Sequence, residues 1–236
     1  MKIDSKTSAI FFDLDDTLYD LMAPFTSALQ KELPHVANAL GSDVDRFFSA
    51  TRHYIDGLWK AYLRGEKALE AIRIERYQLA ARDFQLMIST DEGQRLQEQY
   101  EVEQGNISLP AVVEAFLGEL SDKQICKGLI TNGTTAGQKS KIATLQLDRY
   151  FATDRMFISD EIGRAKPNAD IFDFVYEQSQ LNDYQCYYIG DSWNLDVEGA
   201  LPTNWHPIWF NHRKREPHRQ TEGYTEITSL EQLTIV

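Results

Sequence analysis

The segment 9–18 constrains the fold of this chain most, because a short apolar run there passes directly into a cluster of acids. Residues 9–12 are apolar, and Asp13, Asp15 and Asp16 follow at once. A short apolar run bounded by polar residues is typical of a buried strand in a parallel sheet. Acids crowded at the end of such a strand repel one another, so they predict a bound cation. Ligands of open parallel sheets bind beyond the carboxyl ends of the strands, so we expect these acids to form the floor of an active site.

The same acids could instead serve a turn, since Asp is a common turn and cap residue. The pattern Asp-x-Asp-x-Thr, straight after the apolar run, favours a functional role for Asp13 and Asp15. For Asp16, a role in the turn is the favoured interpretation.

Strand and helix patterns alternate along most of the chain. After a first strand ending at Asp13, strands are expected over 125–130, 156–158, 186–189 and 206–210. This alternation predicts the α/β class, with a doubly wound parallel (Rossmann-like) sheet covered by helices on both faces. Pro207 within the last run predicts an edge strand, because proline cannot donate to a neighbouring strand.

An insertion separates the first strand from the second. The strand ends at Asp13 and Thr131 are 118 positions apart, whereas a strand–helix–strand unit needs only ~30 residues. Helical periodicity fills most of this excess. We therefore expect a core domain of residues 1–18 and 92–236, with an inserted helical cap domain of residues 19–91. The chain leaves and rejoins the core beside the acids, so the insertion is expected to act as a lid.

Composition limits the partners and the compartment. The net charge is −12, with 36 acidic against 24 basic residues. This argues against nucleic-acid polymers and membrane surfaces as partners, because both require a basic face. Cys126 and Cys186 lie within apparent strands, as expected of core residues in a reducing cytosol. No apolar run approaches the ~20 residues of a membrane span, and no secretory leader is evident. A cytoplasmic monomer or homodimer is expected.

Reactive side chains follow three of the expected strands. Beside Asp13 these are Thr131 with Asn132, and Asp191, while Lys166 precedes a helix. Neighbouring strand ends lie about 5 Å apart, so the groups can converge on one ligand. Carboxylate oxygens of Asp13 and Asp191 suit Mg²⁺, and Thr131, Asn132 and Lys166 are expected to hold phosphate oxygens.

Two acids at this spacing suit phosphoryl transfer. Asp13 can attack phosphorus to form an aspartyl-phosphate. Asp15, two residues on, can protonate the leaving oxygen and later deprotonate the water that hydrolyses the intermediate. Metal and lysine neutralise the charge on the transferring group.

At this point the chain strongly resembles the haloacid-dehalogenase-like (HAD) hydrolase superfamily. Its four motifs are similar, in order, to Phe12-Asp13-Leu14-Asp15-Asp16-Thr17-Leu18, Leu129-Ile130-Thr131-Asn132-Gly133, Lys166-Pro167 and Gly190-Asp191-Ser192-Trp193-Asn194-Leu195-Asp196. The resemblance covers nearly all of the core, and the insertion after the first motif is similar to the family's helical C1 cap.

The resemblance also implies roles for single residues. It implies Asp13 as nucleophile, Asp15 as acid/base, and Mg²⁺ held by Asp13, the Asp15 backbone carbonyl and Asp191. Asp196 would orient Lys166 or a water on the metal.

Within this family the second aspartate, Asp15, indicates a phosphatase or phosphomutase rather than a dehalogenase. The carboxyl-terminal segment is similar to the nucleotidase-like branch. A Mg²⁺-dependent phosphatase acting on a nucleoside monophosphate or a sugar phosphate is therefore the leading hypothesis. The alternatives are a phosphomutase, a receiver-like phospho-acceptor that does not turn over, and a non-catalytic binder with the same fold.

One further segment invites a different interpretation. Residues 133–140 resemble a nucleotide-binding loop in composition, with two glycines before Lys139 and Ser140. The spacing departs from that of the P-loop, and Gln138 stands where glycine belongs. We therefore expect no nucleotide loop there.

Overall fold

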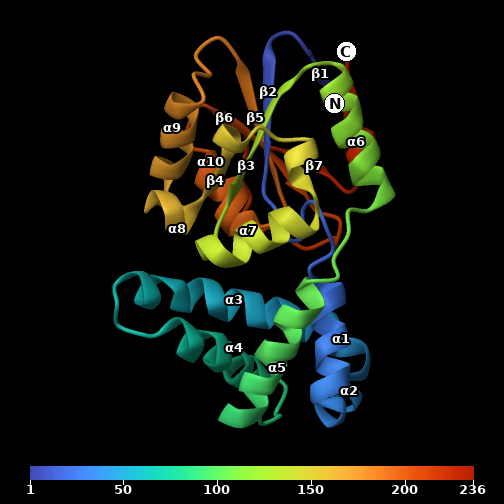
Figure 1. Ribbon diagram of the computed structural model, residues 1–236, viewed down its shortest axis with the longest axis vertical. Coiled ribbons are helices and arrows are strands. Elements are labelled where there is room, and N and C mark those ends of the chain that lie inside the picture. Colours follow the sequence, from blue (N-terminus) through green and yellow to red (C-terminus); the bar gives the residue numbers. More distant parts are fainter. The chain divides into compact units, whose positions relative to one another are not determined.

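The computed structural model describes residues 1–236, which form two compact units (Figure 1). The first comprises Met1–Asp20 with Ser108–Val236, and the second comprises Leu21–Ile107. The helical unit thus begins near the expected residue 19 but ends well after the expected residue 91. Its last helix, α5 (Thr90–Gln104), packs against α1 (Met22–Glu32) and α4 (Leu69–Asp83), which explains the later boundary.

The first unit contains a six-stranded, fully parallel sheet, as the alternation predicted. Its order is β4-β3-β2-β5-β6-β7. The strands are β2 (Ser8–Phe12), β3 (Cys126–Thr131), β4 (Met156–Ile158), β5 (Gln185–Gly190), β6 (Trp205–Phe210) and β7 (Thr225–Ile227). The two terminal strands, β1 (Lys2–Ile3) and β8 (Thr234–Ile235), pair separately.

Helices and short turns link these strands. The helices are α6 (Ala111–Asp122), α7 (Thr135–Thr144), α8 (Ser159–Ile162), α9 (Ala169–Gln178) and α10 (Glu198–Ala200). Short 3₁₀ turns follow at η2 (Leu147–Arg149), η3 (Thr153–Arg155) and η5 (Leu230–Gln232), and a π-helical turn, η4 (Trp193–Val197), precedes α10.

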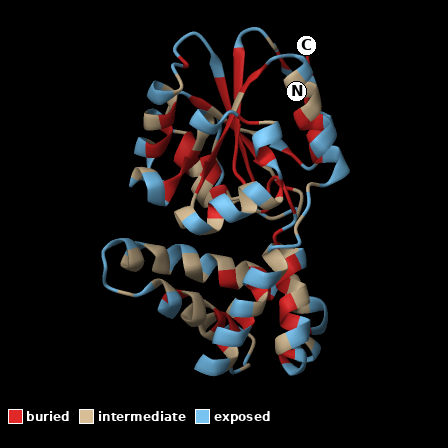
Figure 2. Cartoon of the chain, in the orientation of Figure 1, coloured by how far each residue is buried: buried red, intermediate tan, exposed pale blue.

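The central strand β2 is buried along its whole length and packs on both faces (Figure 2). Successive side chains of a strand point to opposite faces. Phe12 accordingly contacts Phe116 of α6 and Phe151, whereas Phe11 contacts Trp205 and Phe157 on the other side. A one-residue shift in the register of β2 would exchange the side chains of its two faces and break both sets of aromatic contacts. The position of Asp13 at its end is therefore well fixed.

The expectation of an edge strand at residues 206–210 was wrong. β7 lies outside β6 and pairs with it from Ile208 to Phe210. Pro207 faces only β5, where it lies opposite Tyr188. Because β7 begins its pairing one residue later, the missing N–H of Pro207 interrupts no hydrogen bond to it.

The second unit is entirely helical. It consists of α1, α2 (Pro34–Leu40), the short turn η1 (Gly41–Asp43), α3 (Val44–Leu63), α4 and α5. Phe25 lies at its centre, with rings of α3, α4 and α5 around it, namely those of Phe47, Phe48, Tyr77 and Tyr100. Its own aromatic core indicates a separate domain rather than an extended loop.

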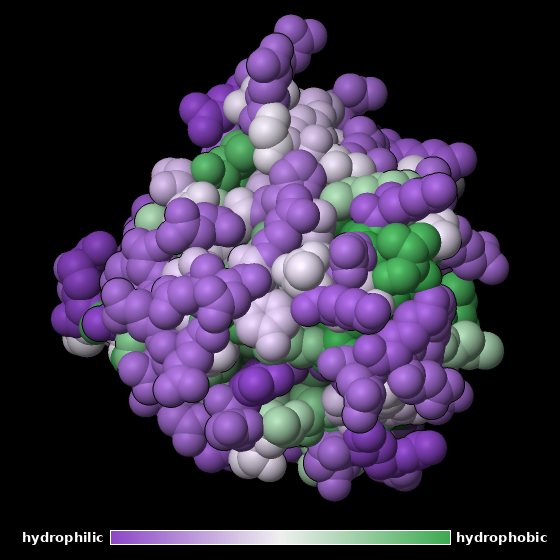
Figure 3. All heavy atoms as spheres, turned by 90° about the horizontal axis from the view of Figure 1, so that it is seen from above, coloured by the Kyte–Doolittle hydropathy of each residue, from purple (hydrophilic) through white to green (hydrophobic).

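The exterior agrees with the acidic composition. Figure 3 shows one face covered mostly by hydrophilic residues, with small separate hydrophobic areas between them. No helix has the length and apolar character needed to span a membrane.

Candidate active site

The aligned ends of β2, β3 and β5 bring the predicted site together. In register, Phe12 lies opposite Leu129 on one side and Ile189 on the other. The backbone N–H of Asp13 continues this ladder and donates to the carbonyl of Ile189 at 2.9 Å. Parallel pairing thus places residues from three distant segments at one edge of the sheet.

A buried ammonium joins two carboxylates at this edge. Lys166 Nζ lies 2.8 Å from Asp13 Oδ1 and 2.7 Å from Asp196 Oδ1. The lysine and Asp196 side chains are each 1% exposed, and that of Asp13 is 7% exposed. Removing Lys166 would leave the two buried carboxylates without a positive partner, so both depend on this ammonium for their stability.

Two further residues fix Lys166. Its ammonium donates to the hydroxyl of Tyr188 at 2.8 Å, and this hydroxyl donates to the carbonyl of Ile130 at 2.7 Å. The side chain of Asn132 makes two hydrogen bonds with the Lys166 backbone. Its Nδ2 donates to the Lys166 carbonyl, and its Oδ1 accepts from the Lys166 N–H. These two hydrogen bonds hold the Asn132 side chain against the Lys166 backbone and use one of its two amide hydrogens.

Asp196 is presented by the π-helical turn that follows Asp191. Such turns often mark functional sites. The backbone N–H of Ser192 donates to Asp196 Oδ2 at 2.8 Å, which folds the carboxylate back over the start of the turn. A Cβ atom on Gly190 would lie 2.3 Å from the Asp196 carboxyl carbon. Glycine before Asp191 is therefore required by the close approach of Asp196.

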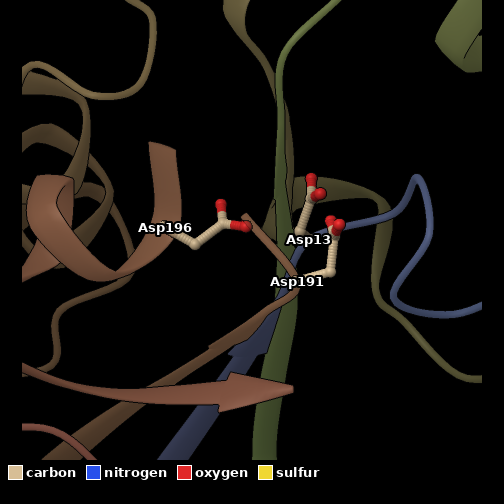
Figure 4. Close-up of side chains that lie close together, drawn as sticks. All are labelled: Asp13, Asp191 and Asp196. Atoms are coloured by element: carbon tan, nitrogen blue, oxygen red, sulfur yellow. The ribbon is translucent and has the colours of Figure 1, made fainter. Parts of the chain in front are cut away.

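Asp13, Asp191 and Asp196 form a buried acidic cluster (Figure 4). Their carboxylates point toward a common region, and one oxygen from each lies within 4.8 Å of the others. Hard oxygen donors of this kind fit Mg²⁺. Both oxygens of Asp196 are bonded to Lys166 and Ser192. Asp13 and Asp191 are therefore the carboxylates best suited to hold a cation.

Burial shapes the charges of the cluster. It raises the pKa of Asp13, an effect that the Lys166 ammonium partly offsets and that Asp191 and Asp15 reinforce. It likewise raises the pKa of Asp196. Burial alone would lower the pKa of Lys166, but the charges of Asp13 and Asp196 raise it overall. Negative charge exceeds positive charge in this cluster, as expected of a site that receives a metal ion.

Asp15 occupies a different environment from Asp13. Its carboxylate accepts hydrogen bonds from Lys141 and Gln138 of α7 and from the hydroxyl of Tyr19. Thr131, at the end of β3, is buried and is bonded to the same Gln138. The structure thus divides the predicted site into a buried centre at Lys166 and a second, partly exposed centre at Lys141.

Asp16 is tied into the loop, in keeping with a structural role. It has a positive φ of 65°. Its buried carboxylate receives a two-pronged contact from the Arg213 guanidinium, at 2.7 and 2.6 Å. Arg213 also bonds Asp20 at 2.7 Å. These contacts brace the loop that follows the proposed nucleophile.

Sequence reasoning missed Tyr188, Gln138, Lys141 and Arg213. Tyr188 lies inside an apolar strand, where an aromatic residue predicts core packing rather than a hydroxyl contact. Gln138 and Lys141 carry a usable signal, since two polar residues three apart share one face of a helix. Arg213 lies in a polar loop after β6, and no local pattern connects it with Asp16.

Comparison with known proteins agrees with this geometry. The chain is 27% identical over 228 residues to the pyrimidine 5′-nucleotidase YjjG of Escherichia coli, with 95% of each chain covered. It is 29% identical over 221 residues to a glyceraldehyde 3-phosphate phosphatase of Methanothermobacter thermautotrophicus, covering 89% of this chain and 88% of that one. The fold matches L-2-haloacid dehalogenase from Xanthobacter autotrophicus, with a TM-score of 0.69, 15% identity and 95% of each chain covered.

The sequence-family model of the haloacid dehalogenase-like hydrolases matches residues 7–202, and this range includes all four motifs. The chain belongs to this family of hydrolases.

Proposed function

We propose that this protein is a Mg²⁺-dependent phosphatase that hydrolyses a small phosphorylated metabolite through an aspartyl-phosphate on Asp13. The observation that carries the proposal is the arrangement at the end of β2. There Asp13 contacts Lys166 and lies close to the buried carboxylates of Asp191 and Asp196, while Asp15 extends toward α7. Asp13 is thus held beside the Lys166 ammonium as the nucleophile. Asp15 is held apart from Asp13, beside Lys141, as the proton carrier.

The reaction would proceed in two displacements. An Asp13 carboxylate oxygen attacks phosphorus, the bond from phosphorus to the ester oxygen breaks, and Asp15 gives that oxygen a proton. A water molecule then attacks phosphorus while Asp15 takes its proton, and the bond to Asp13 breaks. Free phosphate leaves and both aspartates return to their starting states.

The remaining residues stabilise charge during both steps. Lys166 neutralises a phosphoryl oxygen, and the Thr131 hydroxyl donates to another. Asp196 and Tyr188 keep the Lys166 ammonium in place. A bound Mg²⁺ would be held by Asp13, Asp191 and the backbone carbonyl of Asp15, and it would supply further neutralisation of phosphate charge.

The proposed substrate class is nucleoside monophosphates or sugar phosphates. The E. coli relative is named a nucleotidase, and the M. thermautotrophicus relative is named for a phosphorylated triose. Residues 21–107 are proposed to act as a cap domain that selects the substrate. The chain enters this unit directly after the loop that follows Asp13.

Phosphate release from a panel of nucleotides and sugar phosphates tests the proposal. We expect release with Mg²⁺, none with chelator, and none from D13N protein under either condition. An isomerised sugar phosphate without free phosphate would instead indicate a mutase. Stoichiometric, lasting phosphorylation without turnover would indicate a receiver-like module. Unchanged activity of D13N would refute the proposed nucleophile.

A further inference from the structure

The helix α7 begins directly after the Thr131-Asn132-Gly133 segment and carries two polar residues toward the site. Its N-cap, Thr134, accepts a hydrogen bond from the Gly137 N–H and so fixes where the helix starts. Gln138 and Lys141 lie three positions apart, on the same helical face.

Gln138 joins two of the proposed functional residues. Its side chain is buried, and its Nε2 lies 2.5 Å from Thr131 Oγ1 and 3.2 Å from Asp15 Oδ2. In its ionised form, which accepts the proton of the attacking water, the Asp15 carboxylate only accepts hydrogen bonds, so the amide nitrogen of Gln138 rather than its oxygen faces Asp15. The two hydrogens of that nitrogen serve the two partners. Gln138 therefore donates to both residues at once.

This contact sets the direction of the Thr131 hydroxyl. A hydroxyl has one hydrogen to donate. Because Thr131 Oγ1 accepts from Gln138, its own hydrogen is directed to another group. In the proposed reaction that group is a phosphoryl oxygen of the substrate.

Gly133 packs closely over the Gln138 side chain. A Cβ atom at Gly133, where φ is +148°, would lie 2.9 Å from both Cγ and Cδ of Gln138. Any larger residue would push the amide away from Thr131 and Asp15. The absence of a side chain at Gly133 thus leaves room for the Gln138 side chain beside Thr131 and Asp15.

Lys141 completes the arrangement around Asp15. Its Nζ lies 2.7 Å from Oδ1 and 2.9 Å from Oδ2, while Tyr19 donates to Oδ1. The carboxylate is therefore held from three directions by groups of two separate segments. Such contacts restrict its rotation about the Cβ–Cγ bond.

We propose that Gln138 and Lys141 are positioning residues that orient Asp15 for proton transfer, and that Gln138 also orients the Thr131 hydroxyl toward phosphate. This inference rests on the proposed phosphatase function. One helix would then align the proton carrier with the phosphate-holding hydroxyl. As the ester bond breaks, the proton of Asp15 would pass to the departing oxygen along a fixed direction.

Two phosphate esters with different leaving groups separate positioning from general damage. An alkyl ester such as a nucleoside 5′-monophosphate needs a proton on its departing oxygen, whereas 4-nitrophenyl phosphate needs it much less. The value of kcat/KM reports on the steps through formation of the aspartyl-phosphate. The ratio of kcat/KM for the alkyl ester to that for the aryl ester therefore measures how well Asp15 delivers its proton.

We expect this ratio to fall about tenfold to a hundredfold in Q138L and K141M protein. In K141R it should fall less, because guanidinium can contact both carboxylate oxygens. The matched control is K139M, which removes an equal charge from α7. Lys139 is exposed and pairs with Glu161 at 2.9 Å, so K139M should keep the wild-type ratio.

An equal loss for both esters in Q138L and K141M, or no loss in either, would overturn the inference while leaving the phosphatase proposal intact. If Q138L fails to fold, K141M and K141R decide the outcome by the same ratio. If wild-type protein releases phosphate from neither ester and from no member of the nucleotide and sugar phosphate panel, the proposed function fails and the inference fails with it.

Discussion

The two lysine–aspartate centres of the site differ in burial and in number of partners. Lys166 is 1% exposed and contacts two carboxylates, whereas Lys141 is 12% exposed and contacts only the carboxylate of Asp15, which is 17% exposed. A buried pair is costly to break because each remaining charge loses its partner. A partly exposed pair can exchange protons with water. The first centre therefore suits a fixed nucleophile, and the second suits a group that gives and takes a proton.

The largest expected effect comes from breaking the buried centre. K166M leaves Asp13 and Asp196 without their shared ammonium, so the free energy of unfolding should fall by about 3–5 kcal/mol. Phosphate release should fall about a thousandfold, through loss of charge stabilisation. Urea unfolding with chelator present, together with steady-state assays, provides the measurement.

K141M is the matched comparison for this stability loss. Because its pair is partly exposed, unfolding free energy should change by only about 1 kcal/mol or less. Equal losses of stability in K166M and K141M would show that the two centres do not differ as described.

The contact of Arg213 with Asp16 is a third ion pair near the site, and we expect its role to be structural. R213K keeps the charge but loses the bidentate hydrogen bonds that the guanidinium donates to the fully buried carboxylate of Asp16. We expect a loss of about 1–3 kcal/mol in unfolding free energy, with kcat reduced less than in K166M. A kcat loss as large as that of K166M at unchanged stability would place Arg213 in the chemistry instead.

Tyr188 supports Lys166 within the buried centre. Y188F keeps the ring but removes the hydroxyl between Lys166 and the Ile130 carbonyl. Leaving these groups without that partner should cost about 1–2 kcal/mol. We expect kcat to fall severalfold with little change in KM, because the lysine loses support rather than charge. A large rise in KM alone would contradict a positioning role.

The smallest expected effect is a pH dependence. The pKa of Lys166 is raised in the folded state, so its contribution to stability is complete below the unfolded pKa of about 10.4 and is lost as pH rises above it. The difference in unfolding free energy between wild type and K166M should stay constant from pH 8 to about pH 10. By pH 11 it should shrink by about 1 kcal/mol. A difference that grows over this range would contradict a raised pKa for Lys166 in the folded protein.

The predictable parts of the site follow from local patterns. Asp13, Thr131 and Asp191 each directly follow or end an apolar run, so strand pairing alone predicts that they converge. Asp196 and Lys166 belong to motifs that lie close to these strand ends in sequence. The contact between them was expected only through the resemblance of these motifs to the hydrolase family, which left a water on the metal as the alternative partner of Asp196.

The unpredicted parts depend on packing between distant segments. The contact of Lys141 with Asp15 spans 126 positions and that of Arg213 with Asp16 spans 197. No periodicity encodes such pairs. The short strand β7 was missed because three residues give too little alternation to identify a strand. Pro207 then led to the prediction that β6 is an edge strand.

Capture of the phosphoryl group on Asp13 tests the proposed nucleophile most directly. Turnover of a good substrate with Mg²⁺ is stopped by rapid acid quench, and the digested protein is analysed by mass spectrometry. We expect a phosphorylated peptide containing Asp13 that appears and decays with turnover in wild type and is absent from D13N. Steady phosphate release with that peptide unmodified at every quench time, and with D13N still active, would contradict it.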